Sequence, residues 1–393
     1  MERNRMELLP GVFFTFVRLK DAPQGCFRAA LLRQLDREEA GMNALLPDVL
    51  LQGTQRDPGP EALAKALDAL GHAKASPFVR KLGEVQAFGV SAVFDNDPAV
   101  FPALAETLAG VLLKPDTRIG QLKKEAVSAA LAAWDAADAQ DDPLAPLCGM
   151  MCGYEDYAVP ARGERPDAGP NYYQKLSKHY RKVLSAAPLE LYYAGAAAPR
   201  DVTQAILDAF GAMPRGELEF DLGTFIRMNA VEAEPRTEDR SGPQGAHRVS
   251  VGWRLGDGME DPDLPVLEAL ACALGEKTGA RVALDVHKGI LTAQTDVDPD
   301  GAEAAVSALR AAAGALSAGE LTQEALDAAR AGRIAALRAI PDDPAALEAF
   351  WLEQDLLGLG LAPDEYAAFT QEAALEDVLS AAAALECDAI LIE

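Results

Sequence analysis

The histidines and cysteines of this 393-residue chain are the side chains best suited to metal binding or nucleophilic chemistry. Its four histidines lie far apart, and none has a second histidine three or four residues away, the spacing that places two ligands on one helical face. They are His72, His179, His247 and His287. Cys148 and Cys152 could hold a metal or act as a redox pair, but without a second pair the sequence favours buried thiols.

Motifs for other chemistries are missing from the sequence. No Gly-x-Ser-x-Gly elbow, P-loop or Gly-x-Gly-x-x-Gly motif follows a predicted strand, so nothing supports a serine hydrolase, a nucleotide hydrolase or a dinucleotide-binding protein. The five cysteines are odd in number and scattered, which argues against a disulfide framework.

The balance of charges narrows the choice of partners. The chain has 36 Lys and Arg against 61 Asp and Glu, a net charge of −25. A field of this sign repels phosphate backbones, so nucleic acid is not an expected partner, whereas basic peptides would be attracted. No apolar run approaches the roughly 18 residues of a transmembrane helix. We therefore expect no membrane association and a location in the cytoplasm.

An internal repeat organises the chain. Pro98 in Asp-Asn-Asp-Pro recurs as Pro299 in Asp-Val-Asp-Pro, and Pro143 in Asp-Asp-Pro recurs as Pro344, both at one offset (299 − 98 = 344 − 143 = 201). The same offset brings the start of the apolar segment 187–193 to the start of 388–393, the last strand-like segment. Three matches at one offset predict two copies of a unit of about 200 residues.

Both copies have the same predicted order of elements: strand, amphipathic helix, strand, a helix that starts after the Asp-Pro step, and a long Ala-rich helix. We therefore predict an α+β fold with a mostly antiparallel sheet in each copy, covered by helices. The predicted strands are 11–17, 26–35, 85–94, 248–255 and 290–296, and the predicted helices are 42–52, 99–113, 119–139, 264–274, 302–316 and 323–340.

The segment between the copies is rich in Pro, Gly and charge, which is typical of an interdomain linker. We accordingly expect a domain at 1–212, a linker at 213–247 and a second domain at 248–393.

This organisation resembles the M16 (insulinase or pitrilysin-like) metallopeptidases. Residues 41–54, Gly-Met-Asn-Ala-Leu-Leu-Pro-Asp-Val-Leu-Leu-Gln-Gly-Thr, are similar to the family's zinc helix, which ends in a similar Gly-Thr. Further similarities are Asp-Asp-Pro at 141–143, the run 153–160 followed by Gly163, and Gln-Gly at 244–245. The resemblance implies two tandem homologous M16-like domains of the LuxS/metallohydrolase-like fold. It is closest to an inactive, YfmF-like bacterial branch, described as associated with the 5-aminopentanol modification of elongation factor P.

The zinc motif itself is degenerate in this sequence. Active members of the family carry His-x-x-Glu-His, in which both histidines bind zinc and the glutamate is the general base. The matching positions here are Ala44, Pro47 and Asp48. A single carboxylate cannot hold a catalytic zinc, which needs three protein ligands and one open position.

The remaining family positions are also altered. The third ligand of active relatives, a Glu on the later long helix, corresponds to Ala130, and Glu125 on the same helix is better explained as a solvated side chain. In the second copy, active relatives carry an Arg and a Tyr that bind substrate. Here His287 matches the place of the Arg, and the stretch 286–293 contains no Tyr. The resemblance therefore implies no metal site, no cofactor and no catalytic residue, with His287 as a substrate-binding candidate.

These departures lead to one main expectation and two alternatives. The main one is a catalytically silent M16-like subunit that pairs with an active His-x-x-Glu-His peptidase to form a peptide-processing chamber. The first alternative is a zinc metallopeptidase with displaced ligands, which would use Asp48, Glu125 and a histidine brought in by folding. The second is a stand-alone peptide-binding scaffold. The sequence leaves the substrate, the partner and the choice between homodimer and heterodimer open.

Overall fold

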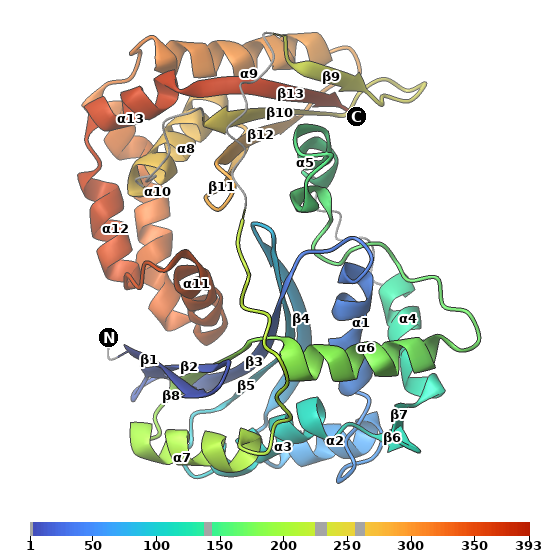
Figure 1. Ribbon diagram of the computed structural model, residues 1–393. Helices are drawn as coiled ribbons and strands as arrows, with labels where there is room; N and C mark the ends of the chain where they lie inside the picture. Colours follow the sequence, from blue (N-terminus) through green and yellow to red (C-terminus); the bar gives the residue numbers. More distant parts are fainter. Residues whose placement is uncertain (1–2, 137–143, 225–233, 256–263) are drawn as a thin grey trace. The chain divides into compact units, whose positions relative to one another are not determined.

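The computed structural model describes residues 3–136, 144–224, 234–255 and 264–393, which form two compact units (Figure 1). Unit 1 comprises residues 1–140, 159–223 and 342–356, and unit 2 comprises residues 141–158, 224–341 and 357–393. Each unit therefore includes a segment from the opposite half of the sequence.

Unit 1 is built on a sheet with the strand order β1, β2, β8, β3, β5, β4. Neighbouring strands are antiparallel except β2 and β8, which are parallel. The central strands β3 and β5 are buried along most of their length, which is typical of a sheet covered on both faces. The strands are β1 (Arg3–Leu9), β2 (Val12–Arg18), β3 (Gln24–Gln34), β4 (Lys74–Leu82), β5 (Val85–Asp95) and β8 (Leu189–Gly195).

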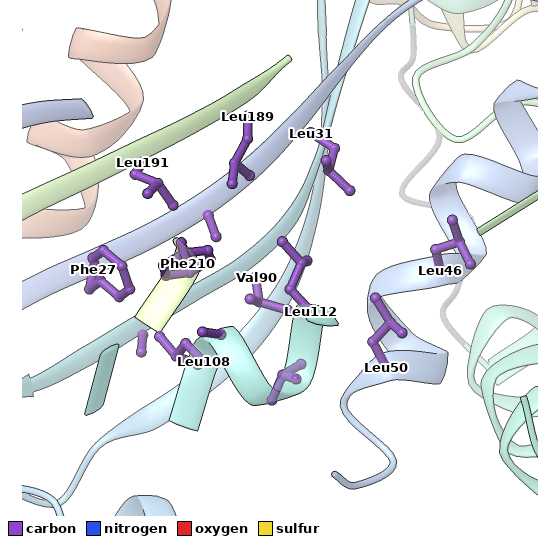
Figure 2. Close-up of a cluster of buried hydrophobic side chains, with 14 of the residues drawn as sticks. Phe27, Leu31, Leu46, Leu50, Val90, Leu108, Leu112, Leu189, Leu191 and Phe210 are labelled. Carbon is purple, nitrogen blue, oxygen red and sulfur yellow. The ribbon is translucent and has the colours of Figure 1, made fainter. Parts of the chain in front are cut away.

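Helices cover both faces of this sheet. On one face, Phe27, Leu31, Val90, Leu189 and Leu191 of the sheet belong to one apolar cluster with Leu46, Leu50, Leu108, Leu112 and Phe210 of the helices (Figure 2). On the other face, Leu352 packs with Leu32, Val85 and Ala87. The helices of unit 1 are α1 (Ala40–Leu50), α2 (Pro60–Asp68), α3 (Phe101–Leu113), α4 (Lys124–Ala136), α6 (Tyr172–Ala186), α7 (Pro199–Phe210) and α11 (Pro344–Leu357). A small hairpin, β6 (Thr117–Arg118) and β7 (Gln121–Leu122), precedes α4.

Unit 2 repeats this plan with the strand order β11, β12, β10, β13, β9. Its strands are β9 (Arg236–Asp239), β10 (Arg248–Leu255), β11 (Arg281–Asp285), β12 (Ile290–Asp296) and β13 (Leu385–Ile392). Its helices are α5 (Ala145–Met151), α8 (Leu264–Thr278), α9 (Ala302–Ser317), α10 (Gln323–Ala339), α12 (Pro363–Glu372) and α13 (Leu375–Ala383). Short 3₁₀ helices are η1 (Asp156–Ala158) and η2 (Ile340–Asp342).

The two sheets confirm the internal repeat. The order β4, β5, β3, β8, β2 in unit 1 matches β11, β12, β10, β13, β9 in unit 2, and in both only the last pair is parallel. The fold is the predicted α+β arrangement of mostly antiparallel sheets with helices packed on them.

The two copies exchange one helix. Helix α5 of the first copy packs on the unit 2 sheet, where Leu147 and Met151 join Ile290, Ala389 and Leu391 in one cluster. Helix α11 of the second copy packs on the unit 1 sheet. Helix α5 begins shortly after Pro143, and helix α11 begins at Pro344. These two prolines are related by the repeat.

The contacts beneath the two exchanged helices differ in chemistry. Arg28 and Gly252 occupy equivalent positions in the two sheets. Gln24 pairs with Asp95 in unit 1, and Arg248 pairs with Asp296 in unit 2. Arg28 and Gly252 each lie four residues further along the same strand. Arg28 forms an ion pair with Glu348 of α11. At Gly252 a Cβ atom would overlap the sulfur of Met151, so the missing side chain lets α5 lie close to β10. One position of the repeat thus supplies a charge in unit 1 and space in unit 2.

Several elements differ from the sequence-based expectation. The helix predicted at 119–139 begins only at Lys124, because the hairpin of β6 and β7 precedes it, and residues 137–139 lie outside the described part. So does the Asp-Asp-Pro step at 141–143. Strand β9 lies within the segment predicted as a linker, and the domain boundaries at 212 and 248 stay predictions. Strands β1, β4 and β11 were not predicted.

Within the described ranges, every helix is too short or too polar to span a bilayer.

Candidate functional site

Helix α1 carries the residues that resemble the zinc motif. Leu45, Leu46, Val49 and Leu50 place it in the main core of unit 1. Pro47 is buried inside the helix, where its nitrogen has no hydrogen to donate to the carbonyl of Asn43. The helix nevertheless continues, and the amide of Leu51 donates to the carbonyl of Pro47 at 3.1 Å.

The positions matching the zinc ligands do not fit a zinc ion. Helix α4 packs against α1, and Ala44 and Ala130 are each only 1% exposed. Neither alanine has a donor atom, and Pro47 has none in its side chain, so Asp48 is the one possible ligand among the four matched positions. The backbone of the motif is therefore present without its metal chemistry.

A positive charge of the chain itself lies near Asp48. Burial raises the pKa of the Asp48 carboxyl, and the Arg162 guanidinium partly opposes this rise in pKa. The same guanidinium lies over the ring of Trp134 on α4, 4.0 Å from its centroid. Because this cation–π contact fixes a cation beside the single carboxylate, an incoming metal ion would meet a charge of its own sign.

The residues of the displaced-ligand alternative are not brought together. Glu125 is exposed on α4. Throughout the described part of the chain, no group of three His, Cys, Asp or Glu side chains has a geometry that could hold a metal ion.

A buried chain of hydrogen bonds lies next to these positions. Nε2 of His179 on α6 donates to Oδ1 of Asn43 at 2.7 Å, and Nδ2 of Asn43 donates to Oε1 of Gln86 at 2.9 Å. Nε2 of Gln86 donates in turn to the carbonyls of Ala40 at 3.1 Å and Ala161 at 2.7 Å. This polar chain links α6, α1 and β5, and it needs an imidazole that carries a proton on Nε2.

The surroundings keep His179 neutral. Burial lowers its pKa to about 4, and the charges of Arg33, Lys182 and Lys175 act in the same direction. Glu39 opposes them, but its carboxylate is already bound by Arg33 at 2.7 Å and Lys182 at 2.6 Å. The imidazole is therefore a structural hydrogen-bond donor at neutral pH.

The loop after η1 closes over the beginning of α1. Gly163 has φ = +63°, and a side chain there would overlap the backbone of Gly41. A side chain at Gly41 would overlap the carbonyl of Glu164. Two glycines of the family-like motifs are thus explained by a close backbone contact.

His287 lies in unit 2, in the turn between β11 and β12. Its amide donates to Oδ1 of Asp285 at 3.0 Å, and its Nε2 is buried without a hydrogen bond to any described residue. Burial lowers the pKa of His287, against the effect of Asp285. The imidazole is therefore neutral at neutral pH. Its role as a substrate-binding residue stays a prediction.

A hollow of about 800 Å³ in unit 1 lies elsewhere, between α3, α7 and the loop at 54–56. Both signs of charge line it, among them Arg56, Glu106, Lys114 and Asp208. None of the matched zinc positions borders it, so it is separate from the degenerate motif.

Sequence reasoning missed Asn43, Gln86, Arg162 and the role of His179. A signal existed for three of them, because Asn43 and Gln86 interrupt apolar stretches and His179 shares a helical face with Leu176 and Val183. Polar residues at such positions must find buried partners. Arg162 lies in a loop and gave no comparable signal.

The comparisons with known proteins agree with this geometry. No family model matches the chain. It is 22% identical over 392 residues to the "Probable inactive metalloprotease YmfF" of Bacillus subtilis (strain 168), covering 91% of this chain and 90% of that one. Among solved structures, a conserved protein from Enterococcus faecalis V583 superposes with a TM-score of 0.83 at 17% identity, covering 99% and 98% of the two chains. A peptidase M16 inactive domain from Pseudomonas fluorescens gives 0.75 at 15% identity, covering 100% and 97%.

The chain therefore has the fold of M16 peptidase-like proteins. The resemblance to an inactive branch of that class, which the sequence motifs suggested, is confirmed. The chain has an M16 peptidase-like fold and resembles proteins that are described as inactive.

Proposed function

We propose that this chain is the catalytically silent subunit of a two-part peptidase, in which an active His-x-x-Glu-His M16 relative supplies the chemistry. The observation that carries the proposal is an M16-like fold in which the side chains at Ala44, Pro47 and Ala130 offer no atom that could bind a metal. The charge of Arg162 lies near Asp48, the one carboxylate among the matched positions.

The chain's own residues would then shape and hold a surface rather than react. The hydrogen bonds from His179 through Asn43 to Gln86 keep α1 in place without a metal. A silent subunit of this kind contributes wall surface and positions a peptide for its partner, which raises efficiency through orientation. No cofactor is needed for that role.

The charge of the chain bears on its substrate and location. A net charge of −25 favours basic peptides in such a chamber. All five cysteines are free, three of them buried, which fits a reducing compartment such as the cytoplasm. Cytoplasmic location and heterodimer formation are parts of this proposal.

The test is to mix the purified chain with an active His-x-x-Glu-His M16 relative. We expect a complex by size-exclusion chromatography with light scattering, and a higher kcat/KM of that relative on a basic fluorogenic peptide. The chain alone should neither cleave the peptide nor retain zinc by elemental analysis. The matched control is the relative with its motif glutamate changed to glutamine, which should form the complex without activity.

Other outcomes would replace the proposal by its alternatives. Zinc at one per chain with cleavage by the chain alone would mean that displaced ligands operate. Peptide binding without any effect on the relative would mean a stand-alone scaffold.

A further inference from the structure

Helix α6 presents a basic face in an otherwise acidic protein. The stretch 168–189 contains no Asp or Glu, and α6 carries Lys175, Lys178, Arg181 and Lys182. At 100° per residue these four side chains fall within one arc of about 120°, opposite the buried face of Leu176, Tyr180 and Val183. All four are exposed.

The hairpin of β6 and β7 lies next to α6 (Figure 1). The amide of Leu122 donates to Oγ of Ser177 at 2.9 Å, and Arg181 donates to the carbonyl of Gly120 at 3.2 Å. The hairpin adds Arg118, which is exposed, to the cations of α6. We call Arg118, Ile119, Lys175, Lys178 and Arg181 the α6 patch.

Ile119 at the tip of this hairpin is unfavourable in two respects for an isolated chain. It is 96% exposed, and its φ of +53° lies in the left-handed region, where a β-branched residue is an outlier. Gly120 follows with φ = +69°, so the turn has the positive-φ pair for which Asn-Gly is the preferred sequence. Within the described part of the chain, no contact offsets the strained backbone and the exposed apolar side chain of Ile119.

Among the described residues, the cations of the α6 patch also lack an acidic partner. Within the described ranges, Arg118, Lys175, Lys178 and Arg181 form no ion pair, whereas the neighbouring Lys182 and Lys123 bind Glu39 and Asp116. Four positive charges without an ion-pair partner, on α6 and on the hairpin that carries the exposed Ile119, form a surface complementary to an anion-rich partner with an apolar pocket.

We propose that the α6 patch is a docking surface for an acidic polypeptide, with Ile119 as the apolar anchor. Charge complementarity selects this occupant. The patch has few cations and no exposed aromatic side chain for stacking on bases, which makes a nucleic acid a poorer fit. A membrane surface is a poorer fit, because the apolar residues of α6 are buried in the core of unit 1.

The experiment uses the full chain and a fluorescently labelled peptide in which Glu alternates with Leu. We expect binding by fluorescence anisotropy that weakens as salt rises. The variant K175E/K178E should lose affinity by at least about tenfold. The matched control K65E/K74E changes the net charge equally at exposed lysines of α2 and β4 and should change affinity less than about twofold.

A second variant separates docking from folding. Ile119→Asn places Asn-Gly in the turn, so the thermal midpoint should rise while peptide affinity falls. A rise in stability with unchanged affinity would remove Ile119 from the proposal, and equal losses in K175E/K178E and K65E/K74E would overturn it.

Competing occupants give distinct results in the same set of variants. Binding of a single-stranded RNA or of phosphatidylserine vesicles that K175E/K178E abolishes, without peptide binding, would overturn the acidic-polypeptide assignment. So would a dimer of the unmodified chain that sediments as a monomer in that variant. No peptidase enters the experiment, so this inference and the proposed function can fail independently.

Discussion

Arg28 of β3 and Glu348 of α11, 320 residues apart in sequence, form a fully buried ion pair. Both side chains are 1% exposed, and Arg80 binds the second carboxylate oxygen at 2.7 Å. Burial alone would raise the pKa of Glu348, but Arg28 and Arg80 hold that pKa below its usual value. The exchanged helix α11 is therefore fixed to the unit 1 sheet by charge as well as by the apolar contacts of Leu352.

Removing this carboxylate should weaken unit 1 strongly. In Glu348→Gln, Arg28 stays buried without a counter-charge, so we expect the free energy of unfolding to fall by about 3–5 kcal/mol. Urea denaturation followed by circular dichroism measures it. The exposed pair of Asp135 and Arg165 provides the control, since Asp135→Asn should change little. Equal losses in both variants would contradict a special role for the buried pair.

The neutral His179 predicts a pH dependence of stability. Its pKa is about 4 in the folded chain and about 6.5 when unfolded, so between these values the unfolded state binds more protons. Stability should thus be full above pH 6.5 and fall as the pH decreases toward 4, by on the order of 3 kcal/mol. In His179→Gln this slope should flatten. Glu348, whose folded pKa is lowered, acts in a more acidic window, because its contribution is lost below its unfolded pKa of about 4.3.

Proline inside α1 predicts a stabilising substitution. Pro47→Ala restores an amide that can donate to the carbonyl of Asn43, and a gain of about 1–3 kcal/mol is expected after the loss of some buried surface. Pro102 lies in the first turn of α3, where proline is tolerated, so Pro102→Ala should give no such gain. Thermal unfolding of both variants tests the difference. A destabilised Pro47→Ala would mean that the packing of the ring outweighs the missing hydrogen bond.

The assignment of the degenerate motif can be tested by rebuilding it. If α1 and α4 keep the family geometry, A44H/P47E/D48H/A130E combined with Arg162→Ala should retain zinc at one per chain by elemental analysis. The same set without A130E has one ligand fewer and should lose zinc on dialysis, with a dissociation constant at least about tenfold higher. Zinc retained equally by both would show that Ala130 is not the third ligand position.

Much of the fold follows from local patterns in the sequence. The offset of 201 residues and the Asp-Pro steps located the two copies, and the helices at 101–113, 302–317 and 323–339 agree closely with those predicted. The strands that were missed, β1, β4 and β11, are partly exposed and lack a long apolar pattern. Period-2 patterns are weak in such strands because neither face is regularly buried.

The helix exchange and the polar contacts could not be predicted in the same way. Nothing in the sequences of α5 and α11 states which sheet each helix covers, because both sheets offer an apolar face. The pairings of Arg28 with Glu348 and of His179 with Asn43 join residues 320 and 136 positions apart. A single sequence records such partners only as isolated polar residues in apolar surroundings.

The helix exchange also has a consequence for biosynthesis. A ribosome adds residues at about 5–20 per second, and domains generally fold in the order in which they emerge. Here the sheet of the first copy is complete at Gly195, but the helix that covers its charged face, with Glu348 and Leu352, is made only near the end of the chain. The nascent first copy therefore exposes Arg28 and its neighbours while some 150 further residues are synthesised. We expect folding of this chain to be largely post-translational and dependent on protection of that open face.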